Sequence, residues 1–224
     1  MTADARPNPT IRAVLWDFGG VFTESPFKAF VEFERRRGLP EGFVRRVNSV
    51  DPDHNAWARF ERSEIGVDEF DVAFAAECTA MGHRLRGSEV IGLLHGAVRG
   101  EMVEALRRCK AHFLNACLTN NVRSASALGL PKPADDREEV KAIFDLFDLV
   151  IESSTVGVRK PEPRFYRLAL EGLGIEPAQA VYLDDLGINL KPARAMGMTT
   201  IKVDSSQQAL GELQAVLNIP LVVQ

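Results

Sequence analysis

The chain has 224 residues, 46% of them hydrophobic and 26% charged, which is ordinary for a globular protein of one large domain or a domain with an insertion. Its net charge of −4 argues against a surface that binds nucleic acid or an anionic membrane, and no apolar run reaches the roughly 18 residues of a membrane span. Its three cysteines are widely spaced, fit no zinc pattern and are typical of reduced thiols, so we expect a cytoplasmic protein.

The first structural element is expected shortly after the N-terminus. Residues 1–10 are polar and include two prolines, which predicts a flexible tail and no signal peptide. Four apolar residues, 13–16, then lead directly into Asp17, which is followed by Gly19 and Gly20. A short apolar run bounded by turn residues is typical of a strand buried on both faces, as in a parallel sheet. Ligands bind at the carboxyl edge of such sheets, so Asp17 is the first candidate functional residue.

Residues 25–100 have a helical pattern throughout and carry no strand signal. The first expected helix opens at Pro26 and stops at Gly38. Asp53 and Asp68 follow natural chain breaks and are the expected N-caps of later helices. The segment is therefore predicted to be an all-helical insertion. Its further helices are expected at 41–47, 54–65, 68–81 and 88–97.

Helices and strands alternate from residue 101 onward, which predicts an α/β protein with a parallel sheet and helices on both of its faces. The expected helices lie at 101–111, 124–128, 136–147, 162–173, 190–196 and 207–217. The expected strands, besides the first, lie at 112–118, 149–152, 180–183 and 199–203.

Polar residues follow four of the expected strands. They are Asp17, Thr119 with Asn120, Lys160, and Asp184 with Asp185. Parallel strands bring their carboxyl ends to one edge of the sheet, so we expect these side chains to converge. Three neighbouring carboxylates repel one another unless a divalent cation or an ammonium group neutralises them. A cation with oxygen ligands and no histidine cluster is most simply Mg²⁺.

These four places also resemble the four motifs of the haloacid dehalogenase superfamily. The matching segments are WDFGGVF, LTNN, GVRKPEP and YLDDLGINLKPARAMGM. The last of them, together with ARFERSEIGVDEF, is most similar to the branch that contains the phosphatase domain of soluble epoxide hydrolases. The resemblance covers almost the whole chain. It implies a three-layer Rossmann-like core, formed by 11–24 and 101–224, with an inserted helical cap at 25–100.

The resemblance implies that the chain is a phosphatase acting on a small phosphorylated metabolite. Asp17 would be the nucleophile that attacks phosphorus and forms an aspartyl-phosphate, which water then hydrolyses. Lys160 would neutralise the phosphoryl charge, and Thr119 would hydrogen-bond the phosphoryl group. Asn120 and Gly20 would contact the substrate. The sequence leaves the identity of the substrate and the oligomeric state open.

The resemblance also implies a Mg²⁺ site and one departure from the family pattern. The ligands would be Asp17, Asp184, Asp185 and the backbone carbonyl of Gly19, which stands where the family carries a second aspartate. A glycine keeps this carbonyl but lacks the carboxyl that protonates the leaving group. General acid–base catalysis by such a carboxyl raises the rate by roughly 10²–10⁴-fold. Either another group supplies the proton, the leaving group needs little help, or phosphatase activity is poor.

Three other functions stay open. A phosphonate hydrolase also lacks the second aspartate but needs a cap lysine, and Lys28 is the only lysine between residues 26 and 100. A 2-haloacid dehalogenase uses no metal, which does not fit the Asp184-Asp185 pair. The main alternative is a non-hydrolytic phospholigand-binding or regulatory module, in which Gly19 marks the lost acid–base function.

Three further polar residues lie close to the motifs in the sequence. Asn189 is expected to cap the helix that follows the acidic pair, in preference to supporting that pair. Arg123 and Arg159 are equally consistent with a phosphate contact and with solvated side chains.

Overall fold

The computed structural model describes residues 7–94, 96–121 and 134–221. These residues form a five-stranded parallel sheet with the strand order β3-β2-β1-β4-β5, which confirms the α/β class. The first strand of the chain is therefore the central one, and its neighbours are the two strands that carry the other polar ends. The strands are β1 (Ala13–Trp16), β2 (Leu114–Thr119), β3 (Leu149–Glu152), β4 (Ala180–Asp184) and β5 (Thr199–Lys202).

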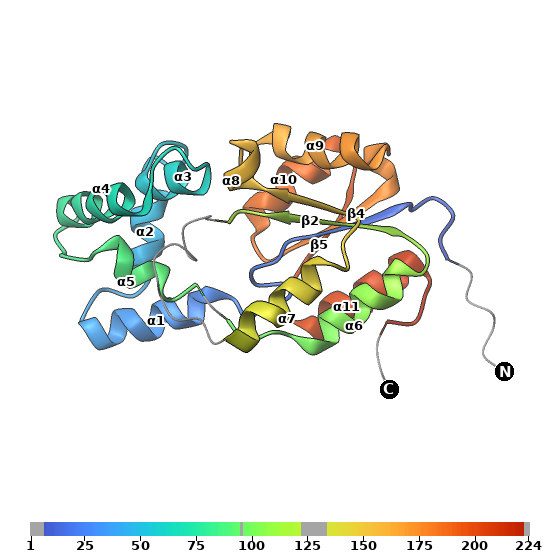
Figure 1. The fold of residues 1–224 in the computed structure, drawn as a ribbon, viewed down its shortest axis with the longest axis horizontal. Helices are drawn as coiled ribbons and strands as arrows, with labels where there is room; N and C mark the ends of the chain where they lie inside the picture. Colours follow the sequence, from blue (N-terminus) through green and yellow to red (C-terminus); the bar gives the residue numbers. More distant parts are fainter. Residues whose placement is uncertain (1–6, 95, 122–133, 222–224) are drawn as a thin grey trace.

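Helices cover both faces of the sheet and complete the three layers (Figure 1). Successive residues of a strand point to opposite faces, so Val14 and Trp16 pack into one buried cluster while Ala13 and Leu15 pack into another. The first cluster lies under α6 (Gly100–Lys110), α7 (Ala134–Phe144) and α11 (Ser206–Leu217). The second lies under α9 (Pro163–Leu173) and α10 (Gly187–Met196). Two short helices, α8 (Ser153–Val156) and the 3₁₀-helix η2 (Pro177–Gln179), lie in the connections.

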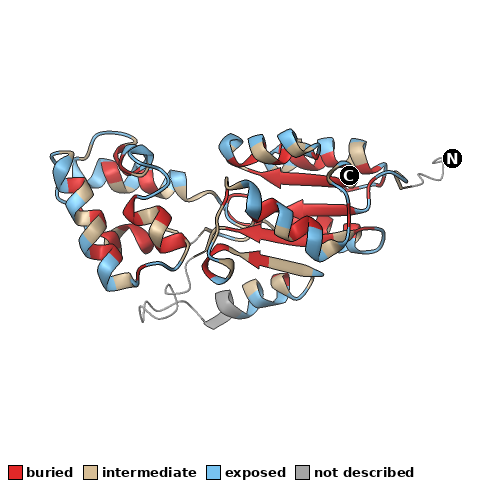
Figure 2. Cartoon of the chain, turned by 90° about the horizontal axis from the view of Figure 1, so that it is seen from above, coloured by how far each residue is buried: buried red, intermediate tan, exposed pale blue. Residues whose placement is uncertain are grey.

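The first five helices after β1 form a group beside the sheet with a buried core of its own (Figure 2). Within that core the ring of Phe70 stacks on the rings of Phe60 and Phe74, at centroid distances of 4.5 and 5.4 Å. The helices are α1 (Pro26–Arg37), α2 (Phe43–Ser49), α3 (Ala56–Glu61), α4 (Val67–Ala80) and α5 (Gly87–Ile91).

The chain enters and leaves this helical group along two adjacent segments. Thr23 and Val98 form an antiparallel bridge, and the Glu24 amide donates to the carbonyl of Ala97 at 2.9 Å. This pairing is what an insertion into the first connection of the sheet requires. The exact domain bounds, 25–100 for the helical part, stay a prediction.

Several helix ends differ from the sequence-based expectation. Asp53 does not cap α3, because the side chain of Asn55 accepts the amide of Ala58 at 2.8 Å and starts the helix there. Asp68 lies inside the first turn of α4 and is not its N-cap, which is Gly66. The helix expected at 88–97 ends at Ile91, because the chain must extend again to pair with the segment that leads into the helical group.

The core elements show smaller shifts. The strand expected from residue 112 starts at Leu114, because the amides of His112 and Phe113 still bond to the carbonyl of Cys109 at the end of α6. The last expected helix and the strand at 149–152 agree with the structure within one residue. The helix expected at 124–128 lies outside the described residues. Within the described part of the chain, no helix has both the length and the apolar character that a bilayer span needs.

A buried polar contact between β1 and β2 gives a stability test. Asn115 is fully buried, and its Oδ1 accepts the indole N–H of Trp16 at 3.0 Å. Asn115→Ala leaves that N–H without its acceptor and opens a void, so we expect the free energy of unfolding to fall by about 2–3 kcal/mol. Urea denaturation measures this, with Gln207→Ala at an exposed position of α11 as the control. A loss no larger than in the control would contradict the assigned role of Asn115.

Candidate active site

Three carboxylates meet at the carboxyl edge of the sheet. Asp17 follows β1 and Asp184 ends β4. Trp16 and Leu183 pair in register, so the next residues of the two strands lie side by side. Together with Asp185, the two aspartates offer ligand oxygens that all lie within 4.8 Å of one another. The structure thus brings these three sequence-predicted residues together.

Lys160 supplies the positive charge of this cluster. Its Nζ lies 2.7 Å from Asp17 Oδ1 and 2.9 Å from Asp184 Oδ2, and the residue is only 1% exposed. Burial alone would lower the pKa of Lys160, but the charges of Asp17 and Asp184 outweigh it and raise the pKa. Burial raises the pKa of Asp17 well above its ordinary value, and the charge of Asp184 adds to this rise while Lys160 opposes it. The ammonium group therefore holds two carboxylates that would otherwise repel.

Asp184 is held from several directions at once. Besides Lys160, it accepts hydrogen bonds from Asn189 Nδ2, at 3.1 Å to each oxygen, and from the Leu186 amide at 2.8 Å. The hydroxyl of Tyr182 donates to it as well. The expectation that Asn189 caps the next helix is wrong, because α10 starts at Gly187 after Leu186 and Asn189 lies within it. Tyr182 was missed, although its place two residues before Asp184 puts both on the same face of β4.

Asp185 faces the start of the helical group. Its Oδ2 accepts the hydroxyl of Ser25 at 3.0 Å, a contact that the sequence pattern did not reveal. Burial raises the pKa of Asp185 to about 6, and the neighbouring charge of Asp184 adds to the shift. Raised carboxylate pKa values at one spot indicate a place where a cation would be favourable.

The two glycines after Asp17 are constrained differently. Gly20 has a φ of +75°, and a Cβ there would lie 2.1 Å from Asp185 Oδ2, so only glycine fits. Gly19 has an ordinary φ, and a Cβ added to it would meet no described atom within 4 Å. The lack of a side chain at Gly20 thus leaves room for the Asp185 carboxylate. At Gly19, by contrast, no neighbouring atom excludes a Cβ.

The residues after β2 lie against the Lys160 loop. Asn120 Oδ1 accepts the Lys160 amide at 2.9 Å, and its Nδ2 donates to the Lys160 carbonyl at 3.0 Å. The Asn120 side chain therefore holds the backbone of Lys160 by two hydrogen bonds. A contact between Asn120 and the substrate stays a prediction. Thr119, the last residue of β2, is buried at the same edge of the sheet. Arg159 is paired with Glu61 of α3, while Arg123 lies outside the described residues.

This fold and this cluster agree with the comparisons to known proteins. Residues 11–197 match the model of the haloacid dehalogenase-like hydrolases, and the chain belongs to this family. It is a hydrolase. Phosphatase MT3486 of Mycobacterium tuberculosis is 32% identical over 212 residues, which cover 89% of this chain and 90% of that protein.

Two larger relatives contain a similar segment. Mouse acyl-CoA dehydrogenase family member 10 is 33% identical over 219 residues, and pig bifunctional epoxide hydrolase 2 is 30% identical over 224 residues. The matches cover 94% and 95% of this chain but only 19% and 40% of those proteins. The similarity to the epoxide hydrolases confirms the resemblance seen in the motifs.

A solved structure supports the fold. A haloacid dehalogenase family enzyme from Bacteroides thetaiotaomicron, in complex with magnesium and inorganic phosphate, superposes with a TM-score of 0.58 at 18% sequence identity. The superposition covers 86% of this chain and 93% of that one. At this identity the likeness concerns the fold alone.

The different constraints on the two glycines can be tested by matched substitutions. Gly20→Ala forces a side chain into a left-handed backbone and against Asp185, so we expect it to lower the free energy of unfolding by at least about 1–2 kcal/mol. Gly19→Ala meets no such obstacle and should leave stability unchanged or raise it by about 0.4–1 kcal/mol. Urea denaturation of both variants checks this. Equal losses at the two positions would contradict the assignment.

Proposed function

We propose that the chain is a Mg²⁺-dependent phosphatase that hydrolyses a small phosphorylated metabolite through an aspartyl-phosphate on Asp17. The observation that carries the proposal is the position of Lys160 Nζ, 2.7 Å from Asp17 Oδ1 at the edge where three carboxylates meet. A fixed cation beside the attacking oxygen is what transfer of a charged phosphoryl group requires. Family membership and the similarity to Phosphatase MT3486 support it.

The residues of the site fit the two chemical steps. A carboxylate oxygen of Asp17 would attack phosphorus, the bond to the leaving oxygen would break, and water would then cleave the aspartyl-phosphate. Lys160 would hold Asp17 in place and offset the phosphoryl charge, and Thr119 would orient the phosphoryl oxygens. The helical part would select the remainder of the substrate, because the sheet edge provides contacts for the phosphoryl group only.

The donor set fits Mg²⁺, since it consists of oxygens without a histidine or thiolate. Asp17, Asp185 and the carbonyl of Gly19 would hold the ion, which supplies charge neutralisation to the phosphoryl group when bound. The oxygens of Asp184 already accept hydrogen bonds from several protein groups. We therefore assign Asp184 the task of holding Lys160 in place, in preference to the ligand role expected from the sequence.

Gly19 favours a second candidate, a non-hydrolytic module that binds a phospholigand. Such a module would need the charge of Lys160 but not the acid–base group that the family usually carries at position 19. The complete set of Asp17, Lys160 and Asp185 favours the phosphatase, because binding alone requires no nucleophile.

The metal requirement predicts a binding signal that does not depend on turnover. Mg²⁺ binds only the folded site, so at 100 times its dissociation constant it should stabilise the protein by about 2.7 kcal/mol. Thermal unfolding with increasing Mg²⁺ measures this, and Asp185→Asn should remove the effect while Asp204→Asn, an exposed acid, keeps it. Phosphatase activity should vanish with chelator and return with Mg²⁺. Full activity in excess chelator would contradict the proposed Mg²⁺ site and favour the dehalogenase alternative.

The missing carboxyl at Gly19 predicts an accumulating intermediate. Aryl phosphates need no proton on the leaving group, so they should react with Asp17 faster than alkyl phosphates and give a burst of product. Gly19→Asp should then speed breakdown of the intermediate by up to roughly 10²–10⁴-fold. The open space around Gly19 supports this variant, and Gly19→Asn, equal in size but unable to transfer the proton, is its control.

Mass spectrometry of the quenched enzyme is the decisive measurement. The adduct of one phosphoryl group should appear on Asp17, and Asp17→Asn should abolish both adduct and burst. No adduct with any activated phosphoryl donor in the presence of Mg²⁺ would favour the non-hydrolytic module.

A further inference from the structure

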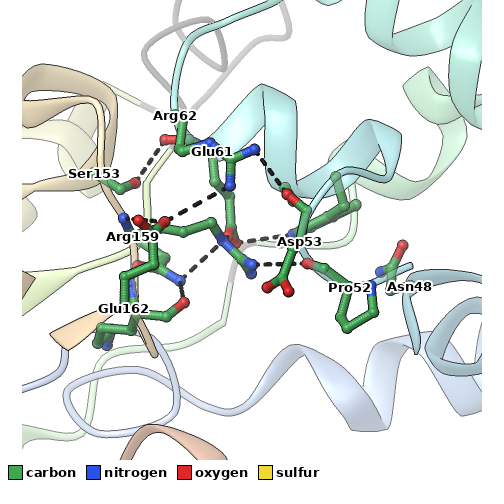
Figure 3. A network of polar contacts seen from close by, with 12 residues as sticks. Asn48, Pro52, Asp53, Glu61, Arg62, Ser153, Arg159 and Glu162 are labelled. Atoms are coloured by element: carbon green, nitrogen blue, oxygen red, sulfur yellow. Dashed lines mark hydrogen bonds and ion pairs between the residues drawn. The ribbon is translucent and has the colours of Figure 1, made fainter. Parts of the chain in front are cut away.

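A buried carboxylate of the helical group lies against the loops of the candidate active site (Figure 3). Glu61, the last residue of α3, is only 8% exposed. Its Oε2 accepts Arg159 Nε at 2.5 Å and Asn120 Nδ2 at 3.2 Å, and its Oε1 accepts the indole N–H of Trp57 at 2.9 Å. Only Trp57 belongs to the same helix, so two of the three contacts reach across to the sheet part of the molecule.

Further contacts join the same two parts around Glu61. Its backbone carbonyl accepts the hydroxyl of the fully buried Ser153 at 2.7 Å. Arg159 Nη1 donates to the carbonyl of Pro52 at 3.2 Å, and Arg62 lies 3.7 Å from Glu162 (Figure 3). The ion pair between Glu61 and Arg159 is largely shielded from water, so separating it leaves two poorly hydrated charges without a partner. These contacts therefore define one docked position of α3 on the sheet.

The carboxylate of Glu61 binds two groups that flank Lys160. Arg159 directly precedes Lys160 in the chain. The Asn120 side chain forms hydrogen bonds with both the backbone amide and the backbone carbonyl of Lys160. Asn120 Nδ2 is shared between that carbonyl and Glu61. Glu61 thus reaches the backbone of Lys160 through one intervening side chain on each side.

We propose that Glu61 is a positioning residue that fixes the Lys160 backbone, so that the ammonium group lies between Asp17 and Asp184 only while α3 is docked. This inference rests on the proposed role of Lys160 in phosphoryl transfer. A lysine side chain is flexible, so the placement of its Nζ depends on a fixed peptide. Both oxygens of Glu61 accept hydrogen bonds, so Glu61 acts through Asn120 and Arg159 and not on the reacting atoms.

Glu61→Gln tests this proposal, since it keeps the size of the side chain and removes the charge that Arg159 requires. The matched control is Glu69→Gln, which breaks the exposed ion pair with Arg59 within the helical group. We expect kcat for p-nitrophenyl phosphate with Mg²⁺ to fall by about 10- to 100-fold in Glu61→Gln with little change in KM. Glu69→Gln should match the wild type.

Hydrogen exchange provides a readout that does not depend on activity. The amide of Lys160 donates to Asn120 Oδ1, so the exchange rate of this amide reports directly on the contact that Glu61 supports. Glu61→Gln should lose protection at the Lys160 amide, and Glu69→Gln should not. If Arg159 carries the effect, Glu61→Gln combined with Arg159→Gln should cost no more kcat than Glu61→Gln alone.

The two readouts separate this inference from the proposed function. Lost protection with lower kcat supports it. Unchanged protection, or lost protection with unchanged kcat, overturns it. A wild-type chain without turnover would refute the proposed function, and unchanged exchange would then still overturn the role of Glu61. If Glu61→Gln fails to fold, Ser153→Ala removes the hydrogen bond to the Glu61 carbonyl and should cause a partial loss of protection at the Lys160 amide relative to the wild type. Unchanged protection there would overturn the proposal.

Discussion

Lys160 carries its charge where water hardly reaches it, and the carboxylates of Asp17 and Asp184 compensate for the lost hydration. Such burial is costly unless every charge is paired and hydrogen-bonded. The surrounding structure meets this condition: Tyr182 and Asn189 hold Asp184, while Asn120 holds the lysine peptide. The place of β1 beside β4 serves the same requirement, because it puts Asp17 next to Asp184.

The contrast between Gly19 and Gly20 separates what the fold requires from what the chemistry requires. At Gly20 the backbone angle and the approach of Asp185 leave no room for a side chain. At Gly19 there is room and no unusual backbone angle, so the fold could accept an aspartate there. Packing around the backbone therefore does not require a glycine at position 19.

The sequence predicted the sheet and the convergence of Asp17, Lys160 and Asp184, because apolar runs mark buried strands and parallel strands share one carboxyl edge. It did not reveal Ser25 or Glu61. Both lie in the helical group, and their contacts depend on how that group rests on the sheet, which no local pattern encodes. The sequence also misplaced the start of α3, because Asn55 and the nearby aspartates have a similar preference for the N-cap position.

The central place of β1 also affects how the chain must fold as it is made. Its partners β2 and β4 follow only at Leu114 and Ala180, so this apolar strand has no neighbour while about a hundred residues are synthesised. The helical group, whose contacts are local and whose core is its own, can form during that interval. Pairing over such distances is slow and leaves apolar strand edges open to aggregation. The bridge between Thr23 and Val98 joins the two ends of the helical group, and both residues are made before β2.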